Sequence, residues 1–117
     1  MIKIKRVYDN VTEEDGFRVL VDRIWPRGLS KENAQIDYWP KEVAPSEELR
    51  KWFAHDPEKW SEFKEKYKEE LSEKDEEIVE LKELAQKNEE LTLLYAAKDK
   101  DHNNAVILKD FLKEHLS

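Results

Sequence analysis

The order of hydrophobic and polar residues changes along the chain, and it predicts strands near both ends with helices between them. Residues 2–7 alternate apolar and charged side chains, which is typical of a strand with one buried face. Residues 17–24 and 91–98 are denser in apolar and branched side chains, as expected for strands that are covered on both faces. Residues 35–39 allow a further short strand, which would end before Pro40.

The middle of the chain spaces its apolar residues three and four apart, as a helix with one buried face does. Ser46 precedes two glutamates and is expected to cap a helix whose apolar face includes Leu49 and Trp52. Asp56, followed by Pro57, is expected to start the next helix. The apolar stripe of that helix comprises Trp60, Phe63, Tyr67 and Leu71. These aromatic side chains are expected in the core rather than on a ligand-stacking surface.

Two further helices are expected on either side of the strand at residues 91–98. Ser72 is expected to cap the first of them, which carries Ile78 and Leu81 on its apolar face. Asp101 is expected to cap the second. The apolar positions of this last helix are Ala105, Val106, Leu108, Phe111 and Leu112.

This order of elements predicts an α/β fold. Apolar strands separated by helices favour a mainly parallel sheet with helices on both faces, so we expect one small three-layer domain over residues 1–117. The order is Rossmann-like, and ligands of such sheets bind beyond the carboxyl ends of the strands. Asp22-Arg23 and Lys98-Asp99 each follow one of the two most apolar strands. We therefore expect both pairs at the same edge of the sheet.

The composition limits the expected cellular location of the protein and the classes of partner that it could bind. The 117 residues carry a net charge of −7, which argues against a protein that covers duplex nucleic acid with a basic face. Cysteine is absent, which excludes disulfides and thiolate metal sites and fits a cytoplasmic protein. No apolar run approaches the roughly 20 residues of a membrane span. Neither a membrane nor a duplex is therefore expected as a partner.

The arginines are unevenly distributed along the chain. All five lie in residues 1–50, where the net charge is −1, whereas residues 51–117 carry −6. The planar fork of arginine suits carboxylates and phosphates better than the ammonium group of lysine does. The first half of the chain is therefore the expected place for recognition of an anion.

Three segments combine residues in a distinctive way. They are VLVDRIWPRGLSK at residues 19–31, APSEELRKWFAHDPEKWSEFKEKYKEEL at residues 44–71 and LTLLYAAKDKDHNNAVILKDFL at residues 91–112. Together they resemble the DUF488 family, most closely its short YeaO-like branch, over nearly the whole chain. The resemblance implies a small three-layer α/β domain of uncharacterised activity. It draws attention to these segments but supplies no substrate.

The first segment places two arginines around a tryptophan, directly after an apolar strand. Arg23 and Arg27 could clamp an anion with Trp25 between them, and Gly28 would let the backbone approach a ligand closely. Alternatively, the arginines pair with nearby acids and lock the loop. Because Arg27 lies farther from the strand, we expect it to contact the ligand, and we expect Arg23 to brace the fold.

Five further residues are candidates for the same site. Asp22 and His102 are the tentative catalytic residues, since an aspartate at a strand end and a histidine that titrates near neutrality can both move protons. Lys98 and Asn103 lie where a strand meets the last helix, whose first amides can receive an anion. His55 precedes a helix–helix corner, where it would either contact a ligand or close the corner through a hydrogen bond.

Other chemistries lack the residues that they require. The three histidines have no metal-ligand spacing, and Gly16 and Gly28 are the only glycines, so no glycine-rich dinucleotide loop is possible. No metal and no cofactor are therefore expected.

Two interpretations of the site stay open. In the first, the protein is a small enzyme or binder for an anionic metabolite, either phosphorylated, a nucleotide or a carboxylate. In the second, it is a non-catalytic module that docks a protein or a short single strand of nucleic acid through the Arg23-Trp25-Arg27 loop. A concave pocket would favour the first interpretation, and an exposed patch around Trp25 would favour the second. The sequence does not specify an oligomeric state.

Overall fold

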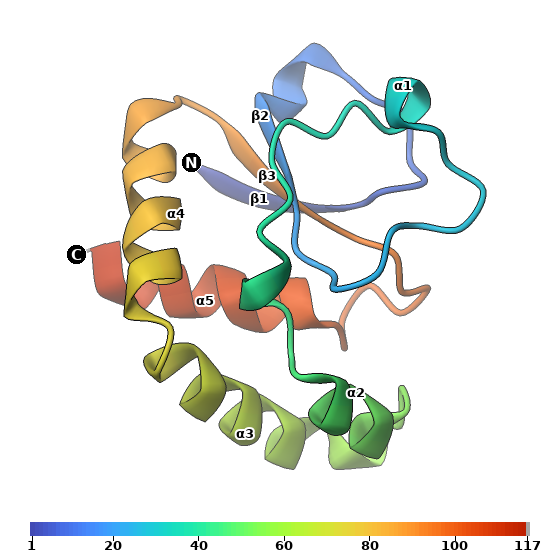
Figure 1. Cartoon of the computed structure of the whole chain (residues 1–117), viewed down its shortest axis with the longest axis vertical. Coiled ribbons are helices and arrows are strands. Elements are labelled where there is room, and N and C mark those ends of the chain that lie inside the picture. Colours follow the sequence, from blue (N-terminus) through green and yellow to red (C-terminus); the bar gives the residue numbers. More distant parts are fainter. Residues whose placement is uncertain (117) are drawn as a thin grey trace.

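Three parallel strands form the centre of the molecule (Figure 1). The computed structural model describes residues 1–116. β1 (Ile2–Arg6), β3 (Leu91–Tyr95) and β2 (Phe17–Leu20) lie side by side in that order. Both outer strands pair with β3 in the parallel direction. The prediction that the two most apolar segments are parallel neighbours is therefore confirmed.

Helices account for most of the remaining regular structure. The α-helices of the described chain are α1 (Lys31–Ala34), α2 (Glu47–Phe53), α3 (Trp60–Ser72), α4 (Asp75–Lys87) and α5 (Asn104–Leu116). Short 3-10 turns add η1 (Glu13–Asp15), η2 (Lys41–Val43) and η3 (Pro57–Lys59). Within residues 1–116, no helix is both long and apolar enough to cross a membrane. The predicted α/β fold, a parallel sheet flanked by helices, is confirmed.

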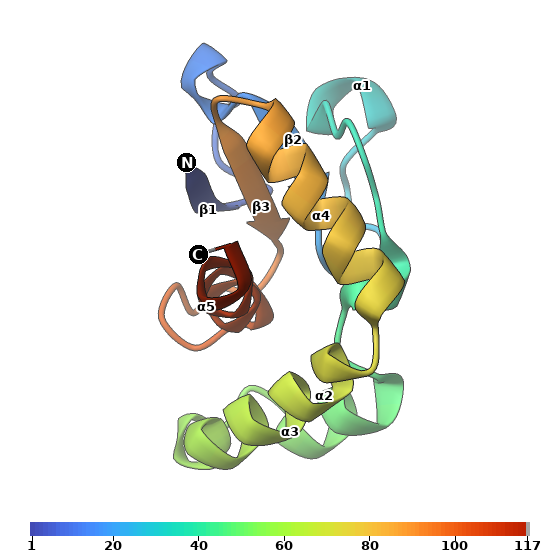
Figure 2. The same cartoon turned by 90° about the vertical axis from the view of Figure 1, so that its left-hand side faces the viewer.

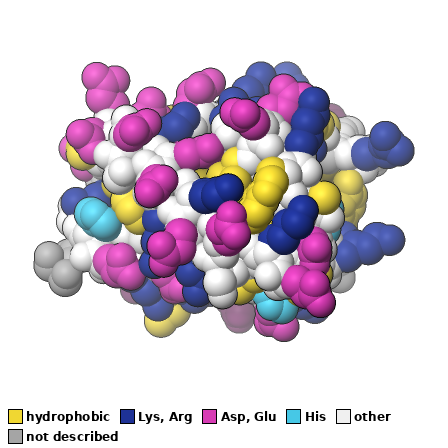
Figure 3. Space-filling model, turned by 90° about the horizontal axis from the view of Figure 1, so that it is seen from below, with side chains coloured by type: hydrophobic (Ala, Val, Ile, Leu, Met, Phe, Trp, Pro, Cys, Tyr) yellow, Lys and Arg dark blue, Asp and Glu magenta, His cyan; other side chains and the backbone are white. Residues whose placement is uncertain are grey.

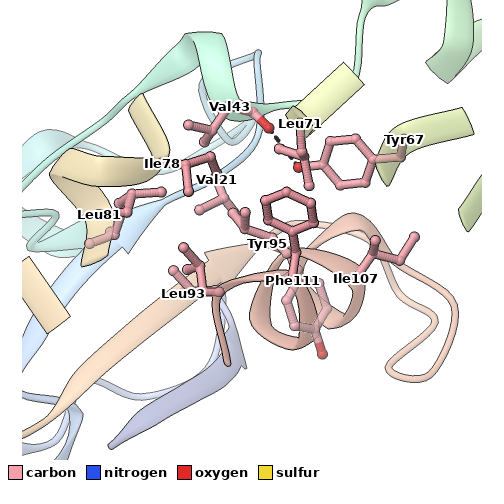
Figure 4. Packing of buried hydrophobic residues seen from close by; sticks show 14 of the residues in the cluster. Val21, Val43, Tyr67, Leu71, Ile78, Leu81, Leu93, Tyr95, Ile107 and Phe111 are labelled. Atoms are coloured by element: carbon pink, nitrogen blue, oxygen red, sulfur yellow. Dashed lines mark hydrogen bonds between the residues drawn. The ribbon is translucent and has the colours of Figure 1, made fainter. Parts of the chain in front are cut away.

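One face of the sheet packs against α4 and α5 (Figures 1 and 2). Successive side chains of a strand point to opposite faces, and Val19, Leu93 and Tyr95 share this one. They join a single buried cluster with Leu81 of α4 and Ile107 of α5 (Figure 4). Burial of this apolar surface is the main source of stability for the domain.

The opposite face is covered mainly by irregular chain, which differs from the expectation of helices on both faces. Leu20 and Leu94 point to this side and pack against Trp25 and Trp39 from the segment 25–39. That segment lies across the sheet from α4, and its helical part is the four-residue α1 (Figure 1). A proline and a glycine near its start prevent regular structure there.

A charged cluster lies on the same face as the irregular cover. Arg18 is 3% exposed and its Nη1 lies 2.5 Å from Oδ2 of Asp15. Lys5 places its Nζ 3.0 Å from the other carboxylate oxygen of Asp15. The guanidinium of Arg18 also donates to the carbonyl oxygens of Ala34 and Gln35. This ion pair and these hydrogen bonds show that Arg18 stabilises the fold, in contrast to the expectation that the arginines serve recognition.

The strands are shorter than the apolar pattern predicts. β2 ends at Leu20 rather than at residue 24: the amide of Val21 still donates to the carbonyl oxygen of Leu94, and bends follow at residues 22–24. The segment 35–39 does not form a strand and makes a single parallel bridge between Tyr38 and Val19. This bridge covers the outer edge of β2, while the outer edge of β1 has no strand beside it in the described chain.

Two of the predicted helix caps are confirmed and two are wrong. The carboxylate of Asp56 accepts a hydrogen bond from the amide of Glu58 and Pro57 is the first residue of η3, as predicted. The hydroxyl of Ser46 accepts a hydrogen bond from the amide three residues on, as an N-cap does. Ser72 instead ends α3, and α4 begins at Asp75. Asn103, rather than Asp101, precedes α5 and accepts a hydrogen bond from the amide of the third helical residue. Asparagine is as good an N-cap as aspartate, so the sequence alone did not distinguish the two positions.

α2 and α3 form a layer beneath α5 (Figures 1 and 2). Phe53 of α2 stacks on Phe63 of α3, with ring centroids 4.1 Å apart. Tyr67 is fully buried, and its hydroxyl donates to the carbonyl oxygen of Val43 over 2.6 Å (Figure 4). These contacts hold the corner between α2 and η3 beside the carboxyl ends of the strands.

Candidate functional site

A cavity of about 340 Å³ opens at the carboxyl end of β2 and β3. Its wall is formed by residues 22–27 after β2, by residues 96, 97 and 102–104 after β3, and by the region around α2. We call it the Asp22 cavity. Its size is at the lower end of the range for small-molecule sites. It lies at the edge of the sheet where the sequence predicted a ligand.

Asp22 connects the ends of β2 and β3. Its Oδ2 accepts a hydrogen bond from the backbone amide of Ala96 over 2.9 Å. Burial raises the pKa of Asp22, and this effect outweighs the hydrogen bonds from Ala96 and Asn104 and the positive charges of Arg50 and His55. Asp22 therefore closes the sheet edge and also offers the cavity a carboxyl group that keeps its proton to higher pH than usual.

Arg23 lines the cavity and braces it. Its Nη2 and Nε donate to the carbonyl oxygens of Ala44 and Pro45 over 3.2 and 3.3 Å. The side chain thus ties the loop after β2 to the segment that leads into α2. This geometry fits the bracing role that the sequence suggested for Arg23.

Arg27 and Trp25 differ in how freely they can meet a ligand. Arg27 is exposed at the wall, and its guanidinium has no hydrogen bond or ion pair with any other residue in the described chain. Trp25 is half-buried, donates from Nε1 to the carbonyl oxygen of Leu29 and meets the ring of Trp39 edge-on at 5.3 Å. The tryptophan is thereby fixed into the cover of the sheet, while the arginine is available to a ligand.

Arg50 and His55 complete the wall from the side of α2. His55 and Ala54 have φ angles of 56° and 47°, in the left-handed region that residues other than glycine rarely adopt. This turn leads the chain from α2 into η3 and brings His55 to the cavity. Sequence reasoning did not select Arg50, because helical spacing places it on an exposed helix face. The concentration of arginine in the first half was the signal that could have identified it.

His102 is oriented by the turn that precedes α5. Its Nδ1 lies 2.9 Å from Oδ2 of Asp99, whose other oxygen accepts from the His102 amide. The ring meets Trp60 edge-on at 5.1 Å. Asn103 is buried, donates to the carbonyl oxygen of Asp99 and accepts from the amide of Val106. The amide group of Asn103 is thus engaged on both sides by the turn.

The structure brings most of the predicted site residues together and leaves one outside. Lys98 is exposed and is not part of the cavity wall, so its role in ligand binding stays a prediction. The predicted residues that do line the cavity are Asp22, Arg23, Trp25, Arg27, His55, His102 and Asn103.

The charge of the wall contrasts with that of the whole protein. Three arginines and a single carboxylate line the cavity, on a chain with a net charge of −7. In residues 1–116, no three histidine, aspartate or glutamate side chains gather where they could hold a metal ion. A local excess of arginine in a concave site is suited to a phosphate or carboxylate.

A second hollow, of about 510 Å³, lies between α2 and α3. Four glutamates contribute to its wall, with Trp52 and Lys66, whose Nζ lies 4.2 Å from the Trp52 ring centroid. Glu70 is already occupied by hydrogen bonds from the amide and hydroxyl of Ser46. Figure 3 shows the face of α2 and α3, where positive and negative side chains are mixed around a small hydrophobic area. The wall of the second hollow, with four glutamates and one lysine, is therefore net negative and unsuited to an anion.

Comparison with known proteins adds a family relationship. The model of the inactive DUF488-N3 subclade matches residues 1–117. The chain is 45% identical over 112 residues to the uncharacterized protein YeaO of Escherichia coli strain K12, with 96% of both chains covered. It is 50% identical over 70 residues to the uncharacterized protein Rv3073c of Mycobacterium tuberculosis strain H37Rv, which covers 60% of this chain and 59% of that one. No solved structure matches the chain.

Proposed function

The chain belongs to the inactive DUF488-N3 subclade of the DUF488 family, and on this premise we propose that it binds a small phosphate or carboxylate in the Asp22 cavity without transforming it. The observation that carries the proposal is the unpaired guanidinium of Arg27 on the wall of a cavity that Arg50 and His55 also line. A description of the subclade as inactive favours binding over catalysis.

The expected affinity follows from the number of available donors. A charge-assisted hydrogen bond contributes about 1.5–3 kcal/mol, so contacts from Arg27, Arg50 and His55 contribute roughly 4.5–9 kcal/mol, which supports about millimolar binding after the costs of association. The rigid loop after β2 reduces those costs, because Arg23 and Trp25 already hold it in place.

The alternative function, a docking module for a protein or a single nucleic-acid strand, has less support. It relied on a flat, exposed Trp25, whereas this ring is half-buried against Trp39. The concavity of the site also favours a small ligand over a macromolecular surface.

Proton transfer by Asp22 and His102 stays a prediction, whereas the effect of the Asp22 carboxylate on anion affinity can be measured directly. In a site that only binds, Asp22→Asn removes a negative charge from the wall, and the new amide oxygen can still accept from Ala96. We therefore expect this variant to bind an anion roughly two- to tenfold more tightly. Isothermal titration with the anions found in a thermal-shift screen would show this, and a large loss of affinity would contradict it.

Arg27→Ala is expected to weaken binding of phosphate esters or carboxylates by about 10- to 100-fold, the loss of one charge-assisted contact. Because the side chain is exposed, its removal should change the free energy of unfolding by less than about 0.5 kcal/mol. Arg27→Lys should restore little affinity, since lysine lacks the planar fork. The measurements are isothermal titration and urea denaturation.

Lys87→Ala is the matched control, because Lys87 is an exposed cation at the end of α4 and does not line the cavity. It removes the same charge from the protein and should leave affinity unchanged. Lys98→Ala tests whether that exposed lysine contributes to the site. Wild-type affinity in Arg27→Ala, or equal losses in Arg27→Ala and Lys87→Ala, would contradict a local contact with Arg27.

A further inference from the structure

We infer that the ligand of the Asp22 cavity joins its anionic group to an aromatic ring, and that it is not a bare anion or a phosphorylated sugar. This inference rests on the proposed function, since it describes the chemical class of ligand for the same site.

The wall of the cavity offers more apolar than charged surface. Phe53 and Phe63 line its buried part, and Ile24 and Tyr8 line it while being 57% and 41% exposed. Large hydrophobic residues with such exposure are few among residues 1–116, and two of them meet at this cavity. Apolar side chains grouped at the mouth of a pocket are typical of a binding site.

The ring of Tyr8 is held in position beside the arginine that is available to the anion. Its hydroxyl donates to the carbonyl oxygen of Arg27 over 2.9 Å, and the guanidinium carbon of Arg6 lies 5.2 Å from the ring centroid. Because Tyr8 and Arg27 both line the cavity and Tyr8 is anchored to the backbone of Arg27, a ligand in the cavity is offered an aromatic surface as well as a guanidinium. A flat ring fits this position, since aromatic rings pack edge-on or offset against each other.

Several polar groups of the wall are already engaged by the protein itself. Asn104 donates to the carbonyl oxygen of Val21 over 2.8 Å, and the amide of Asn103 is engaged by its own turn. The guanidinium of Arg23 is engaged by two carbonyl oxygens. Each ligand hydroxyl needs a donor or acceptor, or its desolvation costs binding energy. Asp22 is the one carboxylate on the wall.

The test compares three probes by isothermal titration with the full chain: phenyl phosphate, inorganic phosphate and glycerol 3-phosphate. Phenyl phosphate is expected to bind at least tenfold more tightly than inorganic phosphate, because the ring buries apolar surface. Glycerol 3-phosphate is expected to bind within about threefold of inorganic phosphate, because the apolar side chains of the wall offer its hydroxyls no partners.

Two variants test whether the phenyl ring binds at the exposed apolar side chains of the wall. Ile24→Ser should weaken the binding of phenyl phosphate by about three- to tenfold, since it removes apolar surface from the wall. It should leave the affinity for inorganic phosphate unchanged, because no charge is removed. Val79→Ser is the matched control, because Val79 is 50% exposed on α4 and does not line the cavity. It should change neither affinity.

The outcomes separate this inference from the proposed function. Equal binding of phenyl phosphate and inorganic phosphate, or tighter binding of glycerol 3-phosphate than of phenyl phosphate, would overturn the aromatic class while leaving an anion site. Absence of binding by all three probes would overturn both. A loss of phenyl phosphate binding in Val79→Ser as large as in Ile24→Ser would overturn the assignment of the ring to the mouth of the cavity.

Discussion

Asp15→Asn is expected to lower the free energy of unfolding by about 3–5 kcal/mol, because it leaves the buried charge of Arg18 without its counter-ion. Asparagine keeps the shape of the side chain, so the change removes charge rather than volume. The remaining partners of Arg18 are the carbonyl oxygens of Ala34 and Gln35, which do not neutralise it. Urea denaturation of wild type and variant at pH 7 measures the loss.

Asp110→Asn provides the control, because it makes the same chemical change at an exposed position on α5. It should cost less than about 0.5 kcal/mol. If Asp15→Asn also costs less than about 1 kcal/mol, the carbonyl groups around Arg18 are sufficient to stabilise its charge and the ion pair is not needed for stability.

The same residue predicts a defined acid sensitivity. Burial alone would raise the pKa of Asp15, but the amide of Thr12 and the side chain of Lys5 outweigh it and lower the pKa from 3.8 to about 2. Since the folded state holds the proton less tightly than the unfolded state, this contribution is fully present above pH 3.8 and is lost as the pH falls towards 2. The stability difference between wild type and Asp15→Asn should therefore narrow over that interval, as measured by denaturation at each pH.

The sheet and the edge at which the Asp22 cavity opens could be predicted because they follow from local pattern. The apolar density of residues 17–24 and 91–98 identified two neighbouring parallel strands, and residues that follow such strands share an edge. The hydrogen bond between Asp22 and the amide after β3 is the direct result of that arrangement.

The cover of the second face could not be predicted from periodicity. Trp25, Leu29, Ile36 and Trp39 pack there from a segment without regular structure, so their spacing follows neither a helix nor a strand. An irregular segment can bury apolar residues at any spacing, provided that its backbone groups find partners.

The roles of the arginines could not be separated from sequence either. Arg18 and Arg50 lie in ordinary strand and helix positions, yet one is buried in an ion pair and the other lines the cavity. The difference depends on which segments pack against each position. Arg50 reaches the site because the α2–η3 corner, with its left-handed turn at Ala54 and His55, lies beside the strand ends. Long-range packing of this kind cannot be predicted from the local pattern of apolar and polar residues.

Phe63→Ala is expected to lower the free energy of unfolding by about 3–5 kcal/mol, a large share of the stability of a domain of this size. Phe63 is 3% exposed and lies between the rings of Phe53, Trp60 and Tyr67, with centroids 4.1, 5.9 and 6.0 Å away. Removal of the ring leaves a void that these large neighbours cannot easily fill, so the loss exceeds the transfer energy of the ring.

Phe63→Leu is the matched control, since it keeps an apolar side chain at the same position and should cost clearly less than the alanine variant. Far-UV circular dichroism with urea, in the absence of any ligand, separates stability from the contact that Phe63 makes with the cavity. If the alanine variant loses less than about 1 kcal/mol, α3 contributes little to the core. The corner that presents Arg50 and His55 would then not be held by this stack, and the preorganised wall on which the proposed anion site depends would lack its support.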